Sequence, residues 1–158
     1  SAEALVKGLS TFGNAHRRFE YKGKVKGMTI VDDYAHHPQE IDATLAAAKE
    51  MKTGKVWCVF QSHTYTRTKA LLDEFAQSLS AADEVVLAPI YAARETDTLG
   101  ISSDDIAVRI EKLGTKAHSL GSFDEIETFL LEHVAPGDLV ITMGAGDINR
   151  VGEALLGM

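Results

Sequence analysis

The chain has 158 residues, of which 45% are hydrophobic and 25% charged, a balance typical of a folded globular domain rather than a disordered segment. Its formal net charge of −7 disfavours binding to nucleic acid, because contacts with phosphate groups need a basic surface. No apolar run approaches the length of a membrane span and no signal-peptide pattern opens the sequence, so we expect neither a membrane partner nor export.

A single domain spanning 1–158 is expected, since this length can supply its own core. The only cysteine, Cys58, excludes a disulfide within the chain and a cysteine-rich metal site. It lies in an apolar run, so we expect a small buried residue on a strand, which fits a reducing cytoplasm.

The pattern of secondary structure is mixed up to residue 26 and then alternates regularly between strands and helices. Residues 1–18 are interpreted as a lead-in segment, and residues 19–26 alternate around Gly23, which predicts a small hairpin. Short apolar runs then predict strands at 28–31, 56–60, 85–88, 117–120 and 139–143. Helices are predicted after Pro38, over 71–79, after capping boxes that start at Ser102 and Ser122, and over 148–156.

This alternation of strands and helices predicts an α/β fold with a mostly parallel sheet and helices on both faces. The strands are apolar throughout, as in a sheet that is buried on both sides. Polar clusters follow four of the strands, at 32–37, 61–67, 89–101 and 144–147. Because ligands of such sheets bind beyond the carboxyl ends of the strands, we expect these clusters to gather at one edge.

The densest chemistry lies in the first two clusters. Two carboxylates and two imidazoles fall within 32–37, and imidazoles can donate to anions or bind metals. In the second cluster, Arg67 could bind a carboxylate or phosphate through two hydrogen bonds, and His63 could donate to the same anion. Ordinary solvent-exposed polar residues and helix caps would also explain both clusters.

Two further features limit the chemistry. The turn Gly-Ala-Gly-Asp at 144–147 lacks the third glycine of a dinucleotide fingerprint, so a plain strand-to-helix turn is the better interpretation. No Gly-x-x-x-x-Gly-Lys-Ser/Thr loop occurs anywhere, so any ATP chemistry would need another domain.

Two alternative functions remain open from the residues alone. A metal-dependent hydrolase could use a two-metal site, although it would leave Arg18 and Arg67 without a role. Its ligands would be Asp32, Asp33, His36, His37 and His63. A nucleotide-binding module without catalysis could rest on residues 144–147.

Four motifs, in this order and at this spacing, resemble the Mur ligase family, and in particular its alanine-adding members. They are Arg-Arg-Phe-Glu at 17–20, Asp-Asp-Tyr-Ala-His-His-Pro at 32–38, Phe-Gln-Ser-His-Thr-Tyr-Thr-Arg-Thr at 60–68 and Gly-Ala-Gly-Asp-Ile at 144–148. The resemblance covers nearly the whole chain. It implies the Rossmann-like C-terminal domain of a three-domain cytoplasmic enzyme of peptidoglycan synthesis.

The resemblance also implies the reaction, in which ATP drives the joining of L-alanine to UDP-N-acetylmuramate through an acyl phosphate. The chain's partners would be the enzyme's own N-terminal domain, which binds the UDP sugar, and its central domain, which carries the P-loop and Mg²⁺ sites. The fragment alone would then be inactive. A sister ligase that attaches murein tripeptide to the same sugar shares much of the pattern and is the alternative.

The resemblance also implies which residues form the site, by their positions in the matching motifs. Arg18 and Asp33 match residues that bind ATP, and no metal ligand is expected within this chain. The matches to substrate-binding residues are Tyr34, His36, His63 and Arg67, of which the last three would also lie at the reacting groups as catalytic residues. The sequence departs from many members at Ser62, where proline is common, and at Thr64, where arginine is common.

Overall fold

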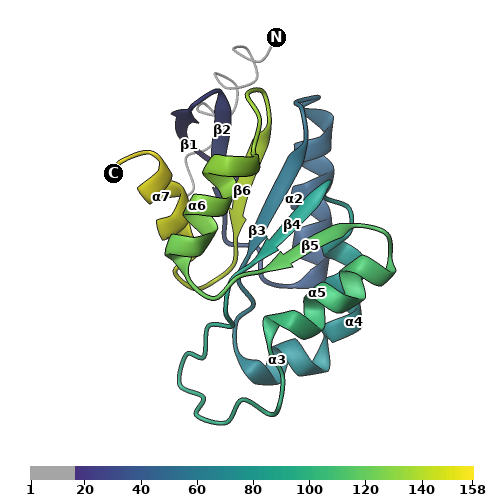
Figure 1. Cartoon of the computed structure of the whole chain (residues 1–158). Coiled ribbons are helices and arrows are strands. Elements are labelled where there is room, and N and C mark those ends of the chain that lie inside the picture. Colours follow the sequence, from purple (N-terminus) through teal and green to yellow (C-terminus); the bar gives the residue numbers. More distant parts are fainter. Residues whose placement is uncertain (1–16) are drawn as a thin grey trace.

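Six strands form one sheet in the computed structural model, which describes residues 17–158 (Figure 1). Their order across the sheet is β1 (Glu20–Val25), β2 (Met28–Asp33), β6 (Leu139–Met143), β3 (Val56–Phe60), β4 (Glu84–Leu87) and β5 (Lys116–Ser119). Only the β1–β2 pair is antiparallel, and the other neighbours run parallel. The predicted mostly parallel α/β fold is confirmed.

Helices cover both faces of this sheet (Figure 1). They are α2 (Pro38–Glu50), α3 (Tyr65–Ala70), α4 (Leu72–Leu79), α5 (Ser103–Lys112), α6 (Phe123–His133) and α7 (Asn149–Leu155). Successive residues of a strand point to opposite faces. Cys58 and Phe60 of β3 therefore pack with α2, α4 and α5, whereas Trp57 and Val59 pack with α6 and α7.

Burial explains why the strands are continuous apolar runs. Every residue of β3, β4 and β6 is buried, because a helix layer lies on each side of them. Cys58 is fully buried on its strand, as predicted. No helix among residues 17–158 is long and apolar enough to cross a membrane.

The predicted hairpin within 19–26 is wrong. Residues Glu20–Val25 form one strand, and the chain turns back only at Lys26 and Gly27, both with positive φ (50° and 83°). Two such residues make the tight turn that matches the twist of paired strands. Gly23 instead lies at a register shift inside β1. Of the predicted lead-in segment 1–18, residues 1–16 lie outside the part that the structure describes.

Helix starts follow local chemistry. The capping box at Ser102 is confirmed, with Asp105 at its third helical position. At Ser122 only half of the predicted box forms: the hydroxyl accepts from Glu125 N, but the Glu125 carboxylate accepts from Gly121 N. Helix α3 was not predicted, because its six mostly polar residues carry no apolar period.

Candidate functional site

The polar segments that follow β2, β3, β4 and β6 meet at the carboxyl edge of the sheet, as the parallel topology requires (Figure 1). The Gly144 amide donates to the carbonyl of Asp33 over 3.1 Å. The Tyr91 amide donates to the carbonyl of Ser62 (2.9 Å), and the Thr64 amide donates to the carbonyl of Tyr91 (2.8 Å). Residues that are up to 111 positions apart in the chain are therefore in direct contact, which confirms the predicted convergence.

Arg17 ties two of these segments together, although the family resemblance pointed to its neighbour, Arg18. Its guanidinium donates to the Asp32 carboxylate (2.8 Å) and to the carbonyls of Gly144 (2.8 Å) and Gly146 (2.7 Å). Asp32 is only 1% exposed, and Arg17 supplies the positive charge beside its carboxylate. The central carbon of the guanidinium also lies 5.1 Å from the centre of the Tyr34 ring.

Arg18, the predicted nucleotide ligand, is exposed, and its guanidinium pairs with none of residues 17–158. Of the two adjacent arginines, Arg17 therefore holds the segments at the carboxyl edge together, whereas Arg18 is exposed to solvent. Sequence alone could not assign which is which, because both carry the same side chain.

Asp33 shapes the start of the segment after β2. One carboxylate oxygen accepts from Phe19 N (2.9 Å) and the other from Ala35 N (2.7 Å). Burial raises the pKa of this carboxyl above its usual value of 3.8, and the two backbone hydrogen bonds oppose that rise. Asp33 thus holds the loop that presents Tyr34, and its predicted contact with the nucleotide stays a prediction.

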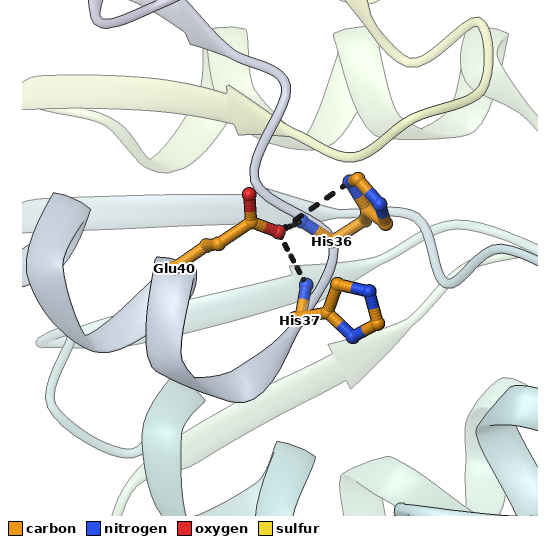
Figure 2. A group of neighbouring side chains, drawn as sticks. All are labelled: His36, His37 and Glu40. Atoms are coloured by element: carbon orange, nitrogen blue, oxygen red, sulfur yellow. Dashed lines mark hydrogen bonds and ion pairs between the residues drawn. The ribbon is translucent and has the colours of Figure 1, made fainter.

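Figure 2 shows His36 and His37 beside Glu40 at the start of α2. One Glu40 oxygen accepts from His36 N (3.2 Å) and His37 N (3.0 Å) and lies 3.6 Å from His36 Nδ1. His36 Nδ1 also lies 2.9 Å from the Tyr34 carbonyl oxygen. These contacts cap the helix and fix the His36 ring beside Tyr34.

The ligand set of the hydrolase alternative does not assemble. One potential ligand atom from each of His36, His37 and Glu40 lies within 4.8 Å of the others, but Glu40 was not in that set and its oxygen already caps α2. Asp32, which that alternative needs, is instead paired with Arg17. The carboxylate–imidazole cluster is therefore better explained by loop and helix geometry than by a two-metal site.

His63 carries the most distinctive side chain of the edge. Its ring stacks on Tyr91, with centroids 5.4 Å apart, and its Nδ1 is buried without a hydrogen-bond partner among the described residues. Burial lowers the pKa of His63 below its usual 6.5, the positive charges of Arg67 and His36 lower it further, and Glu95 opposes them. The lowered pKa favours the neutral imidazole, and the two positive charges that act on it belong to the other predicted catalytic residues.

The turn at 144–147 is confirmed as a strand-to-helix connection, and its glycines are required by close packing. A Cβ on Gly146 would lie 2.8 Å from the Tyr91 ring, and one on Gly144 would lie 2.6 Å from the Gln61 carbonyl oxygen. The Gln61 amide also exchanges two hydrogen bonds of 3.1 Å with Asp147. Packing thus accounts for this motif without a nucleotide.

Helix α3 begins at an unusual residue. Thr64, its N-cap, has φ 67° and ψ 146°, a region that is nearly exclusive to glycine. Its hydroxyl accepts from Arg67 N (3.2 Å). The Glu95 carboxylate accepts from Tyr65 N (2.5 Å) and Thr66 N (3.2 Å) and also from the Thr66 hydroxyl. Glu95 was missed as a site residue, because the sequence marked its loop, 89–101, only as one of four polar clusters.

Comparison with known proteins places this arrangement in a family. The family model described as "Mur ligase, glutamate ligase domain" matches residues 17–146. The UDP-N-acetylmuramate–L-alanine ligase of Lachnospira eligens is 57% identical over 98% of this chain, and that of Clostridium novyi is 56% identical over 98%. In both cases the chain spans only 34% of the relative's length.

Solved structures agree in fold. The UDP-N-acetylmuramate–alanine ligase of Thermotoga maritima is 28% identical, with a TM-score of 0.73 over 96% of this chain and 31% of that one. A murein peptide ligase from Psychrobacter arcticus has a TM-score of 0.74 over 90% of this chain and 29% of its own, and at 23% identity it bears on the fold alone. Because the family model covers most of the chain, the protein belongs to the Mur ligase family and carries its glutamate ligase domain.

Proposed function

We propose that this chain is the C-terminal domain of a cytoplasmic UDP-N-acetylmuramate–L-alanine ligase and closes over its active site. The proposal draws on relatives of that name that are up to 57% identical. ATP would convert the muramoyl carboxylate to an acyl phosphate, and the alanine amine would then attack it and release phosphate. The nucleotide and Mg²⁺ would be held mainly by the central domain, since this chain has no P-loop.

The observation that carries the proposal is the group formed by His36, His63 and Arg67 at the carboxyl edge. The Arg67 guanidinium pairs with no described carboxylate, and His63 Nδ1 is buried without a described partner. Side chains without partners can bind an anionic substrate. When this domain closes over the active site, the substrate would supply the missing hydrogen bonds and charge while water is excluded.

Individual roles follow from charge and position. Arg67 would bind the alanine carboxylate through two hydrogen bonds. His63, whose lowered pKa favours the neutral imidazole, would hydrogen-bond the alanine amine or accept its proton, and His36 and Tyr34 would line the same place. Arg18 is exposed and its guanidinium pairs with none of residues 17–158, which suits a contact with ATP phosphates supplied by the other domain.

The test is Arg67→Ala in the full-length ligase. Loss of a charged contact to substrate costs about 3 kcal/mol, so kcat/KM for alanine should fall about 10²-fold, measured as alanine-dependent ADP release. Arg109→Ala is the matched control, because the Arg109 guanidinium contacts Asp73 (2.8 Å) and the Asp105 carbonyl (3.3 Å), neither of them a predicted site residue. Equal thermal unfolding of both variants would show that the domain still folds. Near-normal turnover in Arg67→Ala would contradict the assignment.

Two further measurements address the alternatives. This chain by itself should not ligate, and alanine-dependent ADP release from it would refute the assignment of the P-loop to another domain. The full-length enzyme should prefer L-alanine to the murein tripeptide as acceptor, and a preference for the tripeptide would identify the sister ligase instead.

A further inference from the structure

The loop 89–101 is attached to the segment that carries His63 and Arg67. Its first attachment is Tyr91, which forms a parallel bridge with His63 and stacks on the imidazole. The backbone of Tyr91 bonds to Ser62 on one side of His63 and to Thr64 on the other. The loop thus extends the β3–β4 pairing past the end of the sheet, as far as the start of α3.

The second attachment is the Glu95 carboxylate. The first amides of any helix lack acceptors within the helix. In α3 they are all taken: Glu95 accepts from Tyr65 N and Thr66 N, and the Thr64 hydroxyl accepts from Arg67 N. A hydrogen bond from the Thr66 hydroxyl lowers the pKa of Glu95, and the hydrogen bonds from the Thr66 and Tyr65 amides lower it further. The carboxylate is therefore charged at neutral pH.

These contacts have a consequence for substrate binding. A helix start with free amides would itself attract an anion. With those amides bound to Glu95 and Thr64, the group left on this turn to receive a carboxylate is the Arg67 guanidinium. Glu95 also holds the chain on the far side of Thr64, whose backbone conformation persists only if its surroundings impose it.

We propose that Glu95 is a positioning residue of the ligase. It fixes the first turn of α3 so that Arg67 and His63 face the alanine substrate, and it gives the loop 89–101 its role. This inference rests on the proposed function. Glu95 acts through its hydrogen bonds to the backbone, and it need not touch the substrate.

The first arm of the test uses the 158-residue chain. Amide hydrogen exchange at Tyr65 and Thr66, followed by NMR, should accelerate at least about tenfold in Glu95→Ala, because these donors lose their acceptor. Glu95→Gln keeps an acceptor oxygen, so its exchange should stay closer to the unaltered chain. Asp97→Ala is the matched control, since this acid of the same loop accepts only from Leu99 N.

A histidine titration separates charge from hydrogen bonding. The charged groups that face His63 are Arg67 and His36, which lower its pKa, and Glu95, which raises it. Both Glu95→Ala and Glu95→Gln should therefore lower the pKa of His63 further, whereas only the alanine variant should release the two amides. Unchanged exchange and an unchanged titration in Glu95→Ala would overturn the inference.

The second arm uses the full-length ligase. Glu95→Ala should reduce kcat about tenfold or more, since misplacement of a binding group by about 1 Å can cost up to 10²-fold, and Glu95→Gln should recover most of the loss. Faster exchange with unchanged turnover would refute the positioning role while leaving the proposed function standing. If the unaltered ligase releases no ADP with alanine, the proposed function fails, and the positioning role fails with it.

Discussion

Thr64→Gly should stabilise this protein, although it removes a helix cap. A threonine at φ 67° and ψ 146° carries about 1–3 kcal/mol of backbone strain, which glycine does not have. Against this, replacing the N-cap threonine by glycine costs a few tenths of a kcal/mol, and the extra freedom of glycine in the unfolded chain costs about 0.5–1 kcal/mol. The balance is about 1 kcal/mol in favour of the variant, or roughly 2–4 °C in melting temperature.

Urea unfolding followed by tryptophan fluorescence measures this directly, because Trp57 is 2% exposed in the core. Ser122→Gly is the matched control: Ser122 also caps a helix, but at an ordinary φ of −157°. It has no strain to release, so it should lose about 1 kcal/mol. If Thr64→Gly loses as much stability as Ser122→Gly, the backbone at Thr64 is not strained.

Three other perturbations test the fold around the site. Arg17→Met should destabilise the domain by about 3–5 kcal/mol in urea unfolding, because it leaves the buried Asp32 carboxylate without a positively charged partner. A loss below about 1 kcal/mol would argue against the ion pair between Arg17 and Asp32. The Cys58 thiol is fully buried, and burial raises its pKa far above the usual range. A thiol reagent at pH 8 should therefore modify Cys58 only as fast as the protein unfolds. Rapid modification would contradict its burial. The pKa of His63 in the folded protein lies below its usual 6.5, so the contribution of His63 to stability is complete above pH 6.5 and is lost as pH falls through the lowered value. In His63→Gln, the free energy of unfolding should therefore depend less on pH below 6.5. An unchanged slope would contradict the lowered pKa.

The sequence by itself determined the order and type of the main elements. Continuous apolar runs such as Val56–Phe60 are typical of strands buried on both faces, and in a parallel sheet the polar residues that follow them fall at one edge. Those inferences hold because period and burial are properties of a segment and its immediate neighbours. Motif spacing then led to the family.

Tertiary structure alone decided which polar residues are committed to the fold and which are available. Arg17 and Arg18 look alike in sequence, yet one is buried against Asp32 and the other projects into solvent, because only the fold brings residues 32 and 144–146 within reach of residue 17. Glu95 likewise became visible only when the loop returned to α3, some 30 residues back along the chain. Contacts at such separations depend on how the sheet orders its strands, and no local pattern encodes that order.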